Sequence, residues 1–223
     1  MTSLSLEKMK NFVFDADGVI CIGAKFGVAL EKEYGIPAAR LKAFFADSFF
    51  DCVTGRSDLK QRLTPVLPSF GWPSTVDAFL QFWFERENVL CPDALACVQT
   101  LRQRGHRCYL GTNQEAYRVA YMRNAMGLER AFDTVFPSCE VGAAKPAPQY
   151  FEEVRRRIDC PRESLFLIDD SLRNVAAAKS CGWRALHYRG TADLTKILAL
   201  TREHENRSDG RRPRLGRRPP NTL

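Results

Sequence analysis

The sequence contains no long apolar run. None approaches the roughly 18 consecutive apolar residues that mark a membrane-spanning helix, so the 223 residues predict no such helix. Residues 1–10 lack the basic segment followed by an apolar segment that is typical of a secretory signal. Histidine is scarce, at three residues, and no histidine clusters with cysteines at the spacing of a zinc site. These absences argue against a membrane protein, a secreted protein and a structural zinc protein.

The eight cysteines include no C-x-x-C pair. Without a secretory signal, a framework of disulfide bonds is not expected. We therefore expect reduced thiols, mostly buried, in a cytoplasmic protein.

The composition is that of a globular protein, with 45% apolar and 26% charged residues. Fifteen Phe, six Tyr and three Trp can fill a sizeable core, which excludes a chain that is disordered throughout. Because domains run to about 100–200 residues, the length fits one domain with an insertion or two small domains. The sequence leaves the oligomeric state open.

Much of the net charge of +7 lies at the C-terminus. From Arg202 onward there are seven arginines and three acids, a net charge of +4. Five of these arginines lie among Pro and Gly with few apolar neighbours: Arg211, Arg212, Arg214, Arg217 and Arg218. We expect residues 201–223 to form a disordered Arg-rich tail. Such a tail can bind nucleic acid or an acidic membrane surface, but a solvated tail without a partner is the simpler interpretation, and we expect neither partner.

Strands alternate with helices over most of the chain. Short apolar runs predict strands at residues 11–15, 106–112, 134–136, 165–168 and 184–187, with helices at 93–104, 115–126, 147–158, 172–181 and 194–202. This alternation indicates an α/β fold with a three-layer, Rossmann-like core, in which helices cover both faces of a parallel sheet. We assign residues 8–19 and 92–200 to this core.

Residues 20–91 interrupt the alternation. Their pattern predicts helices at 23–34, 38–47, 58–66 and 75–88 and no clear strand. Ser74 or Thr75 can cap the last of these helices. We expect a small helical cap beside the carboxyl ends of the strands, where open α/β sheets bind ligands.

Acidic residues end two of the predicted strands. Asp15 and Asp17 follow the first strand, and Asp169 and Asp170 follow the fourth. On neighbouring strands these carboxylates would repel one another by several kcal/mol at separations of about 4 Å. A cation must offset this repulsion, and Mg²⁺ is a hard ion that prefers carboxylate oxygens. The sequence therefore predicts a magnesium site at this edge.

Two further segments place polar groups near that edge. Thr112 and Asn113 end the second strand, and Lys145 precedes a helix in a segment stiffened by Pro146 and Pro148. An isolated lysine is usually an exposed surface residue, but here Lys145 can supply a fixed positive charge facing the carboxylates.

Together these segments resemble the haloacid dehalogenase-like (HAD) hydrolase superfamily. All four family motifs appear in order between residues 11 and 190: Asp15-x-Asp17-Gly18-Val19, Gly111-Thr112-Asn113, Lys145-Pro146 and Asp169-Asp170-Ser171. The inserted helices are similar to the cap of the subfamily that holds haloacid dehalogenases, phosphoglycolate phosphatases and β-phosphoglucomutases.

The resemblance implies a role for each residue. Asp15 is expected to be the nucleophile that forms an aspartyl-phosphate, and Asp17 the general acid and then the general base. Mg²⁺ is expected to bind the carboxylates of Asp15 and Asp170 and the main-chain carbonyl of Asp17, with Asp169 contacting it through water.

The same resemblance assigns the phosphate-binding groups. They are the Thr112 hydroxyl, main-chain N–H groups near Asn113, and Lys145. The sequence departs from the family at two positions, because many relatives have Gly where Asp169 stands and Asp where Asn174 stands. We interpret Asp169 as compensating for the acid missing at Asn174.

Asp17 separates the possible activities. Related dehalogenases lack an acid at this position, because a departing halide needs no proton, whereas a departing alkoxide does. We therefore expect a phosphatase acting on a small phosphorylated metabolite, by default a sugar phosphate or a phosphorylated organic acid. A sugar phosphomutase of the β-phosphoglucomutase type is the alternative. An inactive protein that binds through its basic tail is disfavoured, because every motif keeps the residue types that its chemistry requires.

Two features of the cap bear on the substrate. Arg56 lies in a Thr54-Gly55-Arg56-Ser57 segment that resembles the loop where β-phosphoglucomutase places an arginine, so Arg56 is a candidate substrate contact; a solvated surface Arg is the alternative. Trp72, Trp83 and Phe84 either line the substrate cavity or form the cap's core, and their helical spacing favours the core.

Overall fold

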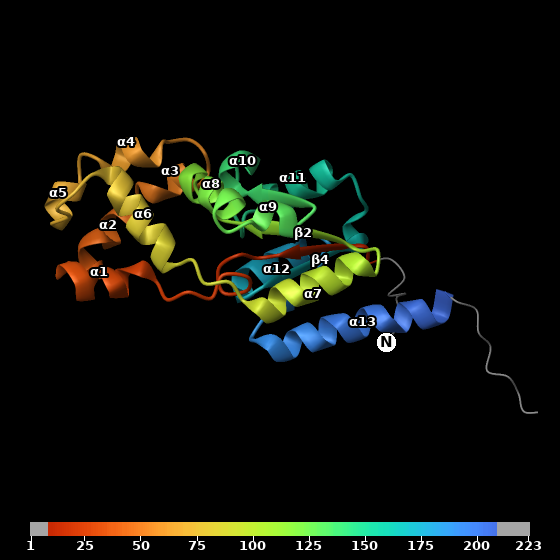
Figure 1. Cartoon of the computed structure of the whole chain (residues 1–223). Helices are drawn as coiled ribbons and strands as arrows, with labels where there is room; N and C mark the ends of the chain where they lie inside the picture. Colours follow the sequence, from red (N-terminus) through yellow and green to blue (C-terminus); the bar gives the residue numbers. More distant parts are fainter. Residues whose placement is uncertain (1–8, 209–223) are drawn as a thin grey trace, which may run out of the picture.

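The computed structural model describes residues 9–208, and at its centre lies a parallel sheet in the order β3-β2-β1-β4-β5 (Figure 1). The strands are β1 (Asn11–Phe14), β2 (Arg107–Thr112), β3 (Thr134–Pro137), β4 (Leu165–Asp169) and β5 (Arg184–His187). β1 pairs with β2 on one side, with Phe14 opposite Leu110, and with β4 on the other, with Phe14 opposite Ile168. The central position of β1 brings its carboxyl end next to the ends of β2 and β4.

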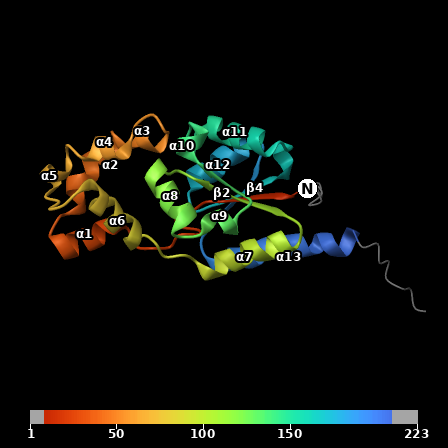
Figure 2. The same ribbon diagram turned by 45° about the horizontal axis from the view of Figure 1, so that its top comes forward.

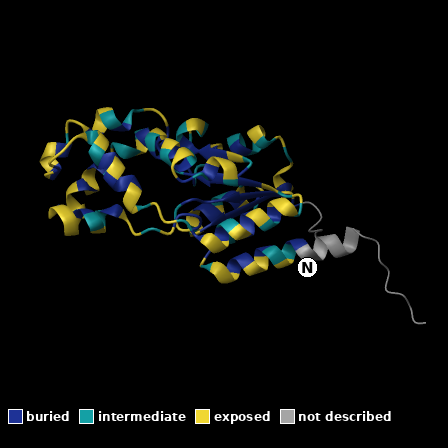
Figure 3. Cartoon of the chain, in the orientation of Figure 1, coloured by how far each residue is buried: buried dark blue, intermediate teal, exposed yellow. Residues whose placement is uncertain are grey.

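Helices cover both faces of the sheet. Side chains alternate between the faces of a strand, so Phe12 and Phe14 of β1 pack into one buried cluster and Val13 into another. The helices α7 (Pro92–Gln103) and α13 (Thr191–Ser208) lie side by side along the first face (Figures 1 and 2). The helices α11 (Pro148–Ile158) and α12 (Leu172–Ser180) cover the second face. The central strands β1 and β4 are buried throughout and the edge strand β5 is of intermediate burial, whereas the helices keep one exposed side (Figure 3). The predicted α/β fold with a three-layer, Rossmann-like parallel core is confirmed.

The remaining core helices are short. They are α8 (Ala116–Asn124), α9 (Leu128–Ala131), α10 (Ser138–Val141) and the 3-10 turn η3 (Arg162–Ser164). Apart from α8, the sequence analysis missed them, because three or four residues are too few to show a 3.6-residue period.

The last helix is longer than predicted. It starts at Thr191 and continues to Ser208, whereas the sequence analysis ended it at residue 202 and began the tail at 201. The residues 202–208 are mostly polar, so they carry no apolar period, but Arg and Glu are good helix formers. The five arginines between residues 211 and 218 lie outside the described residues.

The segment between β1 and α7 is helical. It contains α1 (Phe26–Tyr34), η2 (Ala38–Leu41), α2 (Lys42–Ala46), α3 (Phe49–Val53), α4 (Leu59–Leu63), α5 (Leu67–Phe70) and α6 (Val76–Arg86). These helices form a group of their own at one end of the molecule, which we call the cap (Figures 1 and 2). Thr75 caps α6, since its hydroxyl accepts a hydrogen bond from the Ala78 N–H over 3.2 Å. The cap encloses a separate, largely aromatic buried cluster.

Polar contacts join the cap to segments that follow β2 and β3. The Ser138 hydroxyl donates to the Val53 carbonyl over 2.6 Å, and the Tyr117 hydroxyl donates to Asp58 over 2.6 Å. The buried Arg118 donates to the Phe84 carbonyl over 2.9 Å. The cap therefore lies against the carboxyl edge of the sheet. Within residues 9–208, no helix combines the length and apolarity that crossing a bilayer requires.

Candidate active site

Three carboxylates meet at the carboxyl edge of the sheet. Asp15 follows β1, Asp169 is the last residue of β4, and Asp170 comes next. Each offers an oxygen, and these oxygens lie within 4.8 Å of one another. Asp15 and Asp169 are buried, whereas Asp170 is exposed. The predicted convergence of acids from two neighbouring strands is present.

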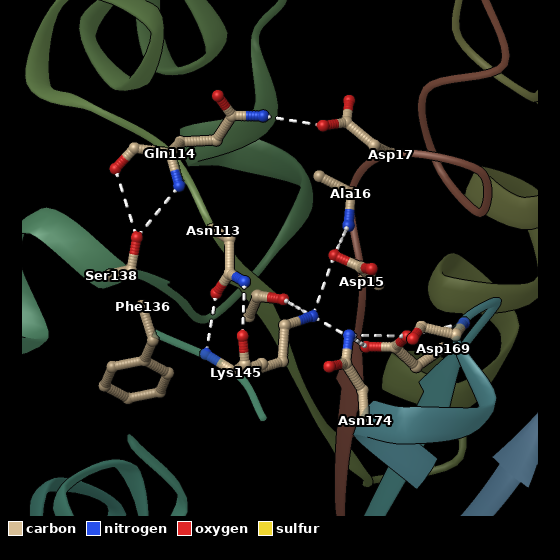
Figure 4. Close-up of polar contacts among 12 residues, drawn as sticks. Asp15, Ala16, Asp17, Asn113, Gln114, Phe136, Ser138, Lys145, Asp169 and Asn174 are labelled. Atoms are coloured by element: carbon tan, nitrogen blue, oxygen red, sulfur yellow. Dashed lines mark hydrogen bonds and ion pairs between the residues drawn. The ribbon is translucent and has the colours of Figure 1, made fainter. Parts of the chain in front are cut away.

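Lys145 lies between two of these acids (Figure 4). Its Nζ atom is 2.9 Å from Oδ1 of Asp15 and 2.7 Å from Oδ2 of Asp169, and it donates to the Gly111 carbonyl over 2.8 Å. The side chain of Lys145 is only 1% exposed. A buried ammonium is costly unless it is fully paired, and here all three of its N–H groups have an acceptor.

The Asp15 carboxylate is held by one of its oxygens. Oδ1 accepts the Ala16 N–H over 2.7 Å in addition to its pairing with Lys145. Within the described part of the chain, Oδ2 has no hydrogen-bond partner. The carboxylate is thus oriented through Oδ1, and Oδ2 is left available.

Burial and neighbouring charges shift the pKa values of this cluster. Burial raises the pKa of Asp15 above its ordinary value; Lys145 opposes this shift, and the charge of Asp169 adds to it. Burial alone would lower the pKa of Lys145, but the charges of Asp15 and Asp169 raise it overall. Burial, followed by the charge of Asp169, raises the pKa of Asp170. The three acids therefore hold more negative charge than one lysine neutralises, and a further cation would favour their ionised forms.

Asp169 is fully engaged by protein groups. Besides Lys145, its oxygens accept hydrogen bonds from the Ser171 N–H over 2.9 Å and from Nδ2 of Asn174 at 3.0 and 3.1 Å. The two positions where the sequence departs from the family pattern are therefore in direct contact. Asp169 holds Lys145 in place in this structure, a role that the sequence analysis did not foresee.

Asn113 lies beside Lys145, and Thr112 precedes Asn113 in the sequence. Thr112 is the buried last residue of β2. The Asn113 side chain donates to the Lys145 carbonyl over 2.7 Å and accepts the Lys145 N–H over 2.8 Å. The side-chain amide of Asn113 thus fixes the backbone of Lys145.

Asp17 points to a residue outside the predicted site set. Its Oδ2 atom accepts a hydrogen bond from Nε2 of Gln114 over 2.7 Å (Figure 4). The only sequence signal for Gln114 was its place directly after Thr112 and Asn113. Asp17 contributes no side-chain oxygen to the carboxylate cluster.

The donor set at this edge fits Mg²⁺. A hard divalent cation prefers carboxylate and carbonyl oxygens, and the cluster offers Oδ2 of Asp15 and the exposed carboxylate of Asp170. Gly18 makes room for one of them, since a Cβ there would lie 2.1 Å from Oδ2 of Asp170, and its φ of +80° also favours glycine. A cavity of about 540 Å³ adjoins the cluster and is lined by Asp15, Asp17, Gly18 and Asp170 together with Lys25 and Glu87.

Arg56 is not brought to this site. Its guanidinium binds Oδ1 of Asp51 at 2.7 and 3.0 Å and stacks over the Phe50 ring, and its side chain is 54% exposed. It lines neither the cavity over the carboxylates nor the neighbouring cavity at Asp17. Arg56 and Asp51 lie five residues apart in the sequence and form an ion pair, which accounts for the difference from the predicted substrate contact at Arg56.

Comparisons with known proteins identify the family. The model of the haloacid dehalogenase-like hydrolase family matches residues 9–182. A sesquiterpene phosphatase of Aspergillus oryzae is 32% identical over 116 residues, which cover 51% of this chain and 56% of that protein. The chain thus matches little more than half of the length of this relative.

Solved structures share the fold. A HAD-like hydrolase from Porphyromonas gingivalis has a TM-score of 0.71 at 22% identity and covers 86% of this chain and 98% of its own. A HAD family enzyme from Bacteroides thetaiotaomicron was solved with magnesium and inorganic phosphate. It has a TM-score of 0.71 at 20% identity, and the match covers 81% of this chain and 94% of that enzyme. The family match extends over more than half of the sequence and includes the carboxylate cluster, Lys145 and the cap, so this chain belongs to the haloacid dehalogenase-like hydrolase family.

Proposed function

We propose that this hydrolase is a Mg²⁺-dependent phosphatase that cleaves a small phosphate monoester through an aspartyl-phosphate on Asp15. The observation that carries the proposal is the buried contact of Lys145 with Asp15 and Asp169, beside the exposed Asp170. It supplies a nucleophile, a fixed positive charge and a set of oxygen ligands at one edge of the sheet.

The first step is attack by the Asp15 carboxylate on phosphorus. The bond between phosphorus and the ester oxygen breaks as the new bond forms, and Asp17 gives its proton to the departing oxygen. In the second step Asp17 takes a proton from a water molecule, which attacks the phosphorus. The bond to Asp15 breaks, and inorganic phosphate leaves.

The remaining residues hold the substrate. The Thr112 hydroxyl and the main-chain N–H of Asn113 would bind the phosphoryl oxygens, and Lys145 would supply positive charge beside them, because phosphoryl transfer depends mainly on positioning and charge. Asp15, Asp170 and the carbonyl of Asp17 would hold Mg²⁺, with Asp169 behind them. When bound, the ion supplies positive charge that lets an anionic nucleophile approach an anionic ester.

The relatives favour phosphoryl chemistry over dehalogenation. The Aspergillus relative is named a sesquiterpene phosphatase, and the Bacteroides enzyme was solved with magnesium and phosphate. Asp17 supports the same choice, since an alkoxide leaving group needs a proton. The substrate is thus a sugar phosphate, a phosphorylated organic acid or a terpenoid phosphate.

A phosphomutase remains the second candidate. It requires basic cap residues to grip a second phosphate. Arg56, the residue expected to do so, pairs with Asp51 instead. Among the described residues, Lys25 is the basic side chain from the cap segment that lines the cavity over the carboxylates. This arrangement favours the phosphatase.

The proposal is tested by phosphate release from a panel of monoesters, with Mg²⁺ and with EDTA. We expect release by the wild type with Mg²⁺ only, and none by Asp15→Asn. Asp159→Asn is the matched control, because Asp159 is exposed at the end of α11 and asparagine tolerates its φ of 54°. Isomerisation of sugar phosphates without phosphate release would favour the mutase, and release that survives in Asp15→Asn would exclude this nucleophile.

A further inference from the structure

A second cavity extends from the candidate active site into the cap. Its volume is about 320 Å³. One end is lined by Asp17, Asn113 and Gln114 of the core. The rest is lined largely by carbon, from the side chains of Phe26, Leu41, Phe45, Phe49 and Trp83. The cavity is therefore polar where it meets the core and apolar within the cap.

The two cavities adjoin each other. Asp17, Lys25 and Glu87 line both the cavity over the carboxylates and the one in the cap. In the proposed reaction Asp17 protonates the departing ester oxygen, so the alcohol portion of the substrate must begin at Asp17. The space that continues from Asp17 is the apolar cavity.

The apolar walls are ordered by stacked rings. Trp83 stacks on Phe26 with ring centres 4.8 Å apart, and Phe45 and Phe49 lie 5.3 and 5.8 Å from Trp83. Glu87 fixes this group, because its two carboxylate oxygens accept hydrogen bonds from the Phe26 N–H and from Nε1 of Trp83. Phe45 and Phe49 are only half-buried and so are the most accessible of these rings.

These walls disfavour a sugar. Buried hydroxyl groups need hydrogen-bond partners, and both oxygens of Glu87 are already used. The remaining polar side chains lie at the catalytic end or, like Lys25, where the two cavities meet. A hydrocarbon would instead bury apolar surface against the rings at no such cost.

We propose that the cap cavity binds the alcohol portion of the substrate, and that this portion is a hydrocarbon rather than a sugar or an organic acid. Its volume is about twice that of a cavity of ~150 Å³ that accommodates benzene, so it fits about a dozen carbon atoms. Phe45, Phe49 and Trp83 are the specificity-determining residues. Lys25, an exposed cation with no ion-pair partner in the described part of the chain, lies where the phosphate joins the hydrocarbon.

This assignment depends on the phosphatase proposed above, and a homologous series of esters tests the two separately. Butyl, hexyl, octyl and decyl phosphate have leaving groups of nearly equal basicity, so differences in kcat/KM report burial of the chain. We expect kcat/KM to rise with chain length, by at most about fourfold per methylene, and to exceed that for glucose 6-phosphate and glycerol 3-phosphate. Equal values along the series, or a preference for the sugar ester, would overturn the assignment and leave the phosphatase intact. Failure to hydrolyse any ester would overturn both.

A pair of neighbouring phenylalanines supplies the control. Phe49→Ala should reduce kcat/KM for octyl phosphate about tenfold or more and change that for glycerol 3-phosphate less than about threefold. Phe50→Ala should leave both values unchanged, because Phe50 is 55% exposed and does not line the cavity. Equal losses on both esters in Phe49→Ala would show a structural role only and would contradict the assignment.

Discussion

Gln114 donates a hydrogen bond from its Nε2 atom to Oδ2 of Asp17 over 2.7 Å. The main-chain N–H of Gln114 donates to the Ser138 hydroxyl over 3.0 Å, and that hydroxyl donates to the carbonyl of Val53 in the cap. A continuous set of polar contacts therefore links the proposed acid to the cap. Gln114 is a positioning residue for Asp17.

Gln114→Leu is expected to separate esters by their leaving groups. It should lower kcat/KM for octyl phosphate about tenfold, because a misplaced Asp17 protonates the alkoxide poorly. We compare kcat/KM because it reports the steps up to release of the alcohol and not the later hydrolysis of the aspartyl-phosphate, which all esters share. The kcat/KM for p-nitrophenyl phosphate should fall far less, since nitrophenolate leaves without a proton. Asp17→Asn should show the same pattern with a larger loss, about 10²–10⁴-fold. Equal losses of kcat/KM on both esters in either variant would contradict the role of Asp17 as general acid.

Mg²⁺ should stabilise the folded protein through the carboxylate cluster. At 100 times its Kd the ion would add about 2.7 kcal/mol, which corresponds to a rise in Tm of about 5–10 °C for a chain of this size. Asp170→Asn should remove most of this rise, because Asp170 is one of the carboxylates proposed to hold the ion and is exposed enough to be changed without disturbing the core. Differential scanning fluorimetry with and without Mg²⁺ measures both values. An undiminished rise in Asp170→Asn would place the ion elsewhere.

Arg118 should be one of the most sensitive positions for stability. It is 1% exposed, and its guanidinium donates to the carbonyls of Phe84 and Glu87 at the end of α6. Arg118→Met would leave these two carbonyls without the guanidinium that donates to them. A buried polar group that loses its hydrogen-bond partner costs about 1–3 kcal/mol, which urea denaturation can measure. Arg173→Met, at an exposed position on α12, is the control and should change stability by less than about 0.5 kcal/mol.

Glu115 should make stability depend on pH. Burial raises the pKa of this carboxyl to about 7, against an ordinary value of 4.5, although it accepts the N–H groups of Tyr117 and Arg118. Between these two values the folded state holds a proton that the unfolded state has lost, so stability falls as the pH rises from about 4.5 to about 7. One pKa unit corresponds to about 1.4 kcal/mol, so the fall is at most about 3–4 kcal/mol.

Glu115→Gln should remove this part of the pH dependence. The free energy of unfolding is measured for wild type and variant at pH 4.5 and at pH 8. We expect the variant to become more stable relative to the wild type at the higher pH. A difference that stays constant, or that shifts toward the wild type, would show that Glu115 is ionised in the fold throughout this range.

The core of the fold was predictable because its signals are local. Three of the strands, β1, β2 and β4, are apolar runs that end in polar residues or are followed by them, and parallel strands bring such ends to one edge. The meeting of Asp15, Asp169 and Lys145 followed from this rule and from the four motifs. The predicted strand at residues 184–187 coincides with β5.

The details that decide chemistry were less accessible. The hydrogen bond between Gln114 and Asp17 joins residues 97 positions apart, and no local pattern encodes it. The sequence predicted a substrate contact at Arg56, but in the structure its guanidinium pairs with a neighbouring acid, Asp51. The sequence left open whether Trp83 packs in the cap's core or lines the substrate cavity, and it does both. It is 7% exposed in the cap's core and also lines the cap cavity. Helical spacing cannot distinguish a ring that packs from one that packs and faces a cavity.

The central claim is that Asp15 carries the phosphoryl group, and trapping the intermediate tests it most directly. Reduction of an aspartyl-phosphate by borohydride converts that aspartate to homoserine, which peptide mass spectrometry locates in the sequence. During turnover with Mg²⁺ we predict homoserine at position 15 and none without substrate. Homoserine at another aspartate, or its absence from position 15 while phosphate is being released, would contradict this account of the active site.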